Sequence, residues 1–117
     1  MSNQDLFLTY LRHYSQKNLV QVAAMFADDI ALRDWKIAVR GKSAAIHETR
    51  KNFESADTIE IQPLDIFENQ DTVAAELKIL VDGMIELHVV DVITFDPNRK
   101  IQSIRAYLGR GDLQTTP

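Results

Sequence analysis

The spacing of the apolar residues changes near residue 58, and this change constrains the fold more than any other feature of the chain. Before it, apolar side chains recur at helical intervals, as Phe7, Tyr10 and Leu11 do. After it, they alternate with polar residues in the two-residue period of a strand, most clearly over residues 85–95. Helices followed by consecutive strands predict an α+β domain. We expect three N-terminal helices on one face of a curved, mostly antiparallel sheet that closes over a pocket.

Local signals give the expected helices. The first helix begins at a capping box formed by Ser2 and Asp5 and should stop near Asn18. A second, short helix follows and is expected to end at the acidic pair 28–29. A third helix is expected over residues 43–55, because its apolar residues share one face.

The second half of the chain is predicted to form consecutive strands. Residues 58–68 resemble a strand interrupted by Pro63, which lacks a backbone donor and therefore marks an edge or a bulge. The Asp-Gly pair at 82–83 is a strong signal for a tight turn between two strands. A last strand is expected over residues 101–108.

Length and charge exclude several classes of protein. With 117 residues, the chain has the size of one domain, residues 1–117, because two separate cores of about 60 residues would each be marginal. The net charge is −4 and no basic block occurs, so we expect no nucleic-acid partner. The longest apolar run covers residues 22–27, whereas a membrane span needs about 20 residues. We therefore expect no membrane partner.

The absence of cysteine excludes disulfides, thiol nucleophiles and cysteine-based metal centres. The three histidines, His13, His47 and His88, share no metal-ligand spacing, so we expect neither a metal nor a cofactor. Residues 1–16 lack the basic and apolar segments of a signal peptide, which makes a cytoplasmic location the expectation.

Asp91 is the most informative single residue, because it occupies a strand face otherwise made of apolar residues such as Val89 and Ile93. An ionised carboxylate without a partner is costly there. It could pair with Arg105 or Lys78 on a neighbouring strand, or a bulge could turn it to the other face. Alternatively, it could be protonated and act as a hydrogen-bond donor. The residues alone leave these alternatives open.

Two further residues on apolar surfaces could carry chemistry. Tyr10 lies in the apolar stripe of the first helix, where a phenol is either an ordinary core residue or a donor that needs a partner. Asp34 follows apolar residues on a short strand expected around residues 30–35, next to Trp35. It is either a general base whose pKa apolar surroundings adjust or a strand-end carboxylate that faces water.

Arg50 is predicted to lie on the inward stripe of the third helix together with Ile46 and Phe53. It could form a structural salt bridge with Asp34 or Asp91. It could also bind a carboxylate or an enolate oxygen of a ligand, since a guanidinium matches either group.

Three segments carry a resemblance to a known family: MFADDIALRD at 25–34, GKSAAIHE at 41–48 and DVITFDPNRKIQSIRAYLG at 91–109. Over residues 5–109 the chain resembles the ketosteroid isomerase-like, or SnoaL-like, members of the NTF2-like superfamily. The resemblance implies a cone-shaped fold in which a curved sheet and three helices surround a pocket. It also implies a homodimer formed through the outer face of the sheet.

The resemblance implies catalytic roles as well. Asp34 matches the base of ketosteroid isomerases, and Tyr10 and Asp91 match the two groups that donate hydrogen bonds to the dienolate oxygen. Arg50 departs from the pattern, because it stands where those isomerases carry a tyrosine. The further residues expected to contact the ligand are Tyr14, Trp35, Arg50, Phe53 and Leu108.

The resulting expectation is a small-molecule enzyme that moves a proton next to the carbonyl group of its ligand without a cofactor, as an isomerase or a related lyase or cyclase. One alternative is a non-catalytic domain on the same fold, with Arg50 anchoring an anionic ligand. Another is a protein-interaction module. Fold alone does not decide between them.

Overall fold

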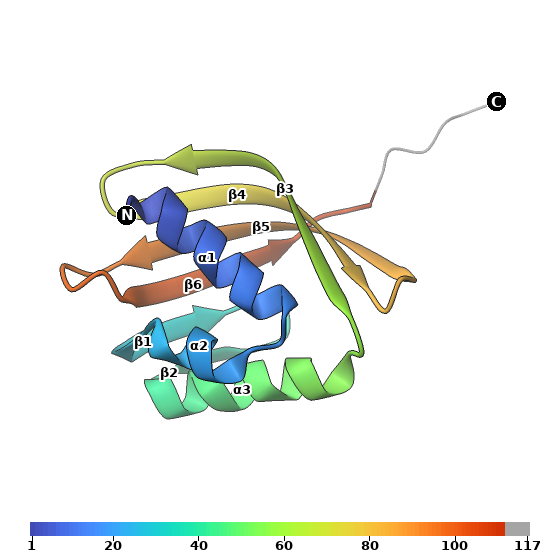
Figure 1. Cartoon of the computed structure of the whole chain (residues 1–117), viewed down its shortest axis with the longest axis horizontal. Helices are drawn as coiled ribbons and strands as arrows, with labels where there is room; N and C mark the ends of the chain where they lie inside the picture. Colours follow the sequence, from blue (N-terminus) through green and yellow to red (C-terminus); the bar gives the residue numbers. More distant parts are fainter. Residues whose placement is uncertain (112–117) are drawn as a thin grey trace.

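The computed structural model describes residues 1–111, whose three helices pack against one six-stranded sheet (Figure 1). The helices are α1 (Asn3–Ser15), α2 (Leu19–Ala24) and α3 (Lys42–Ser55). Two strands separate α2 from α3, and four consecutive strands follow α3. The arrangement confirms the α+β class predicted from the change in periodicity.

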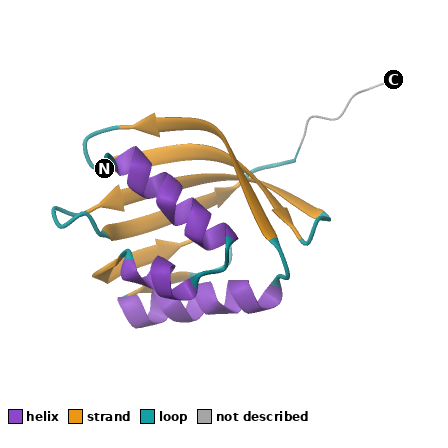
Figure 2. Ribbon diagram, viewed as in Figure 1, coloured by secondary structure: helices purple, strands orange, loops and turns teal. Residues whose placement is uncertain are grey.

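The sheet has the strand order β2-β1-β6-β5-β4-β3. Neighbouring strands are antiparallel except for β1 and β6, which are parallel. Figure 2 shows the strands curving around the helices. The strands are β1 (Phe26–Arg33), β2 (Ala38–Arg40), β3 (Ile59–Glu68), β4 (Thr72–Val81), β5 (Ile85–Phe95) and β6 (Ile101–Leu108).

The beginning of the chain follows its local signals closely. The capping box is confirmed, because the Asp5 amide donates to Ser2 Oγ at 3.0 Å and the Ser2 amide donates to the Asp5 carboxylate at 3.1 Å. Helix α1 ends at Ser15, three residues before Asn18. Lys17 has a positive φ of 55°, and Asn18 caps α2 by accepting from a backbone amide. The chain therefore turns from one helix into the next at these two residues.

The predicted end of the second helix is wrong. Helix α2 stops at Ala24, and the residues expected to continue it begin β1 at Phe26. A short apolar run such as 22–27 has no period that separates a helix from a buried strand. Tertiary pairing decides the outcome, since Phe26 lies opposite Ile101 and the Ile101 amide donates to the Met25 carbonyl at 2.7 Å.

Two predicted irregularities are confirmed. The register between β3 and β4 shifts between Pro63 and Asp65, so Pro63 does mark a bulge. Asp82 and Gly83 both have positive φ values in the turn between β4 and β5. The Asp82 carboxylate also accepts from the backbone amides of Asp57 and Thr58, at 2.7 and 3.0 Å. This turn is therefore fixed to the segment that joins α3 to β3.

The core lies between the helices and the concave face of the sheet. Phe7 of α1, Val22 of α2, Ile30 of β1 and Ile93 of β5 are completely buried there. Helix α1 packs against β3 and β4, whereas α3 packs against β1 and β2. None of the helices in residues 1–111 is long and apolar enough to cross a membrane. The helices leave part of the concave face uncovered, and the candidate site occupies that part.

Candidate functional site

A cavity of about 410 Å³ lies between the concave face of the sheet and helices α1 and α3. Its volume falls in the range of sites that hold small organic molecules. Inward-facing residues of β3 to β6 form a continuous apolar wall, with Ile61, Leu77, Ile79, Leu87, Val89 and Ile104 among them. Polar side chains enter from α1, from α3, from the loop after β1, from the turn after β4 and at one position of β5. The site is thus an apolar pocket with a few polar groups.

Asp91 is the polar group on the apolar wall. It follows Leu87 and Val89 in the inward row of β5, which continues with the buried Ile93, and only 9% of its surface is exposed. Its register partners on the neighbouring strands are Ala75 and Ala106, neither of which can neutralise a carboxylate. Burial raises the pKa of Asp91 to about 7. A large share of the Asp91 carboxyl groups is therefore protonated at neutral pH and able to donate a hydrogen bond.

The two cations proposed to pair with Asp91 lie on the other face of the sheet. Arg105 is opposite Val92, and Lys78 is opposite His88, so both side chains belong to the convex face. Lys78 forms an ion pair with Glu86 at 3.1 Å instead. The hypothesis of a structural ion pair for Asp91 is therefore wrong. The ladder of β5 is regular through Asp91, so the alternative of a bulge is wrong as well.

Tyr10 contributes a buried phenol from α1. It is 5% exposed and lines the cavity. Burial raises the pKa of Tyr10 well above its usual value, and the negative charges of Tyr14 and Asp91 add to the rise. The hydroxyl therefore stays protonated across the physiological range and is available as a donor in the cavity.

Tyr14 lies one helical turn further along α1, with its ring centroid 5.8 Å from that of Tyr10. The Asn52 side chain of α3 donates to the Tyr14 hydroxyl at 3.1 Å. Burial raises the pKa of Tyr14 to about 12, although the hydrogen bond from Asn52 opposes the rise. The ring of Phe53 packs edge-on against Tyr14 at 4.8 Å. The contacts from Asn52 and Phe53 hold Tyr14 in place in the cavity wall.

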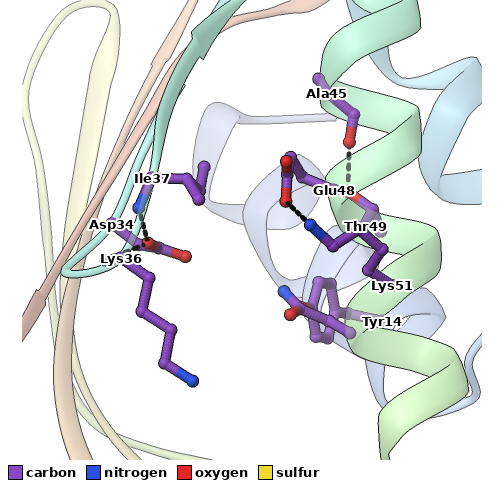
Figure 3. A network of polar contacts seen from close by, with 9 residues as sticks. Tyr14, Asp34, Lys36, Ile37, Ala45, Glu48, Thr49 and Lys51 are labelled. Atoms are coloured by element: carbon purple, nitrogen blue, oxygen red, sulfur yellow. Dashed lines mark hydrogen bonds and ion pairs between the residues drawn. The ribbon is translucent and has the colours of Figure 1, made fainter.

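Asp34 lines the cavity from the loop that joins β1 to β2. Its Oδ1 accepts from the backbone amides of Lys36 and Ile37, at 2.7 and 2.9 Å, and its own amide donates to the Ile37 carbonyl at 2.9 Å. These bonds fix the side chain in a tight turn and leave its second oxygen for other contacts. In Figure 3, Asp34 faces Thr49 and Tyr14 across the space between the hairpin and α3.

Trp35 and Lys36 follow Asp34 and also line the cavity. Trp35 is 42% exposed, which places it at the mouth of the cavity. Lys36 lies two residues after Asp34, and Figure 3 shows both side chains on the same loop.

Three residues expected to contact the ligand do not line the cavity. Arg50 is exposed on α3, because the buried face of this helix runs through Ala45, Thr49 and Phe53. Consecutive residues of a helix point in directions about 100° apart. Thr49 therefore faces the core, whereas the next residue, Arg50, faces solvent. The prediction that Arg50 faces inward is wrong. Neither of the two roles left open for it, a salt bridge with Asp34 or Asp91 or a contact with a ligand in the cavity, agrees with this exposed position.

Phe53 and Leu108 are the other two. Phe53 is buried, but it packs behind Tyr14 and does not reach the cavity. Leu108 is 44% exposed at the end of β6, where it lies opposite Val89, and it does not line the cavity either. Neither prediction of direct ligand contact agrees with the geometry.

The sequence reasoning missed the polar face of α3. Thr49, Asn52 and Ser55 line the cavity from this helix, and Asp82 lines it from the turn after β4. The three helical residues follow one another at intervals of three, which is the spacing of one helix face. That spacing was a signal in the sequence, but small polar residues at such positions are as typical of an exposed face.

The described residues show no metal-binding arrangement. Within residues 1–111, no group of three or more His, Asp or Glu side chains is placed to hold a metal ion. The polar groups that line the cavity include the Asp34 carboxylate at the mouth, the phenols of Tyr10 and Tyr14, and the Asp91 carboxyl with its raised pKa on the apolar wall.

A curved sheet that surrounds such a cavity together with three helices defines an NTF2-like fold. Residues 7–104 match the model of the SnoaL-like domain, and the chain belongs to this family. No curated protein sequence matches the chain significantly.

Solved structures with similar folds agree with this assignment. The epoxide hydrolase/cyclase-like enzyme SalBIII, described with a role in pyran ring formation in the polyether salinomycin, has a TM-score of 0.80 at 21% identity; the match covers 92% of this chain and 90% of SalBIII. A candidate ketosteroid isomerase from Kribbella flavida DSM 17836 has a TM-score of 0.82 at 10% identity, with 98% and 83% covered. A candidate SnoaL-like polyketide cyclase from Shewanella denitrificans OS-217 has a TM-score of 0.82 at 15% identity, with 92% and 90% covered. At these identities the likeness establishes the fold.

Proposed function

We propose that this domain is an enzyme that moves a proton next to the carbonyl group of a small, largely apolar substrate. Asp34 is the general base, and Tyr10 and Asp91 donate hydrogen bonds to the oxygen of the enolate. The observation that carries the proposal is the contrast between two carboxyl groups in one cavity. Burial raises the pKa of Asp91 to about 7, whereas Asp34 lies in a turn where backbone amides donate to it.

The proposed reaction needs only side chains of the protein to move the proton. The Asp34 carboxylate takes a proton from the carbon next to the carbonyl. The electron pair of that C–H bond forms a C=C bond, and the π electrons of the carbonyl group move to its oxygen. The Tyr10 hydroxyl and the protonated Asp91 stabilise the resulting enolate oxygen. Asp34 then returns the proton to a carbon further along the conjugated system. The substrate is isomerised, and each protein group recovers its original protonation state.

The apolar wall contributes to this chemistry in two ways. It lowers the local polarity around the ligand, which strengthens each hydrogen bond to the enolate oxygen. It also disfavours the ionised form of Asp91, which keeps this carboxyl a donor. Arg50 lies outside the cavity, so no guanidinium from α3 opposes the protonation of Asp91.

The first test is an ultraviolet assay with a β,γ-unsaturated 3-ketosteroid, in which the conjugated enone appears as the product forms. Asp34→Asn and Tyr10→Phe are expected to reduce kcat strongly, by a factor of about 10² or more for an oxyanion donor. Arg50→Gln is the matched control, because this side chain is exposed on α3, and it is expected to leave kcat unchanged. Equal loss in the control would argue against the assignment of the site.

A second measurement does not depend on the steroid. NMR detects exchange of α-protons for deuterium in a set of enolisable ketones, with the wild type and Asp34→Asn compared side by side. Exchange that requires Asp34 supports the proposal even if the steroid is not turned over. Ketones that bind equally well to both proteins without exchange would instead assign a non-catalytic ligand-binding role.

A further inference from the structure

A second hollow lies on the convex face of the sheet, away from the helices. It has a volume of about 300 Å³ and is formed by β1, β2 and β6. Leu32 and Ile104 line both this hollow and the cavity described above. Strands β1 and β6, which carry Leu32 and Ile104, therefore separate the cavity on one side of the sheet from the hollow on the other.

Three arginines surround the second hollow. Arg33 and Arg105 lie directly opposite one another on the parallel strands β1 and β6, and Arg40 lies on β2 opposite Ala31. Because Ala31 and Arg33 are two residues apart on one strand, all three arginines share the convex face. Three arginines from three adjacent strands thus line a single hollow.

The floor between the arginines consists of small side chains. Ala31, Ala38 and Ser103 line the hollow and share its face of the sheet. Small residues at these positions leave space between the guanidinium groups, and the Ser103 hydroxyl adds a further possible donor. The hollow is therefore large enough for a group that accepts hydrogen bonds from several sides.

The charges at this place are not balanced by the protein. Within residues 1–111, no carboxylate forms an ion pair with Arg33, Arg40 or Arg105. The Nε of Arg105 is buried and has no hydrogen-bond partner among the described residues. Like charges directly opposite each other on neighbouring strands destabilise a sheet, and a buried donor without a partner is also costly. The net charge of the whole chain is −4, so a general excess of positive charge does not explain the cluster.

We propose that the hollow formed by Arg33, Arg40 and Arg105 binds the phosphate group of a small molecule. A guanidinium group recognises phosphate oxygens with paired N–H donors, and such charge-assisted bonds are strong. Three guanidinium groups match the three acceptor oxygens of a phosphate ester better than the two oxygens of a carboxylate, which a single guanidinium can bind in a bidentate manner. A bound phosphate would neutralise the repulsion between Arg33 and Arg105 and provide acceptors for this cluster.

The test is an NMR titration of the full chain with inorganic phosphate at constant ionic strength, with chloride as the reference anion. Saturable shifts are expected at the backbone amides of Ala31, Ala38 and Ser103. A parallel titration with phenyl phosphate separates the two possible sources of the group. Tighter binding of the ester would indicate a phosphorylated small molecule, and equal or weaker binding would indicate free phosphate.

Arg33→Gln and Arg40→Gln are the informative variants, because both side chains are exposed and their replacement leaves the buried part of Arg105 in place. Each is expected to weaken phosphate binding by about tenfold, the loss of one charge-assisted bond. Arg50→Gln removes an exposed arginine on α3 and is expected to leave the affinity unchanged.

Three results would overturn the proposal. The first is the absence of saturable shifts at these amides. The second is an equal loss of affinity in Arg50→Gln, which would indicate unspecific screening of charge. The third is a phosphate-independent dimer, detected by sedimentation, that Arg33→Gln or Arg40→Gln dissociates. That result would assign the arginines to an interface with a second copy of the chain.

Discussion

Asp91 and Arg105 stand on adjacent strands but on opposite faces of the sheet. Asp91 is paired in register with Ala106, and Arg105 with Val92. Although Asp91 and Arg105 are close along the paired strands, the sheet itself lies between their side chains. Among residues 1–111, this leaves Asp91 without a cation on one side and Arg105 without a carboxylate on the other.

The isolation of Asp91 predicts that the stability of the fold falls as the pH rises. Its pKa is about 7 in the folded protein, compared with a reference value of 3.8. Between these values the folded state holds a proton that the unfolded state has released, so stability decreases with pH and levels off above pH 7. The decrease attributable to Asp91 is about 4 kcal/mol at most. Urea unfolding at several pH values measures it.

Asp91→Asn is the control for this pH dependence, because it keeps the shape of the side chain and removes the titration. The difference in unfolding free energy between the variant and the wild type is expected to grow in favour of the variant from pH 4.5 to pH 8. A difference that stays constant over this interval would show that the pKa of Asp91 is not raised.

The pH profile of catalysis is expected to depend on the same group. If protonated Asp91 donates to the enolate oxygen, kcat/KM falls as the pH rises through about 7. In Asp91→Asn the amide still donates, so this decrease should disappear. Asp91→Ala has no donor and is expected to lose a factor of about 10² to 10³ in kcat. A decrease near pH 7 that persists in Asp91→Asn would assign it to another residue.

The change of period near residue 58 predicted the order of helices and strands because it depends on burial, which any compact domain must satisfy. The position of Asp91 on an inward face followed from the same alternation. The register of β5 against β6 did not, because strand parity gives the face of each strand separately. For this reason Arg105 remained a possible partner of Asp91 until the two strands were aligned.

Helix α3 shows a second limit of sequence analysis. Its buried face contains Thr49, and Arg50 lies outside it. A helix face with Arg50 inward and one with Arg50 outward both fit the apolar pattern of α3, because this helix has few large apolar residues. The turn that holds Asp34 through the amides of Lys36 and Ile37 was also hidden, because side-chain to backbone bonds leave little trace in apolar periodicity.

The bond between Asn52 and Tyr14 is expected to contribute modestly to stability. Asn52→Ala removes the donor at 3.1 Å, which should cost about 0.5–1 kcal/mol and raise the pKa of Tyr14 above its present value of about 12. Ultraviolet titration of the phenol and urea unfolding measure the two effects. Tyr14→Phe combined with Asn52→Ala should cost less than the sum of the single changes, and strict additivity would show that the two side chains do not interact.

Asp34 is predicted to have separable structural and catalytic roles. Its Oδ1 accepts from two backbone amides, and the carbonyl oxygen of an asparagine can accept in the same way. The free energy of unfolding of Asp34→Asn should therefore lie within about 0.5 kcal/mol of the wild-type value. In Asp34→Ala it should be lower by about 1–2 kcal/mol, because the turn amides lose their acceptor. Both variants should lose the exchange of α-protons, since neither retains a carboxylate base. Exchange that survives in Asp34→Asn while Asp34→Ala is destabilised would restrict Asp34 to holding the turn.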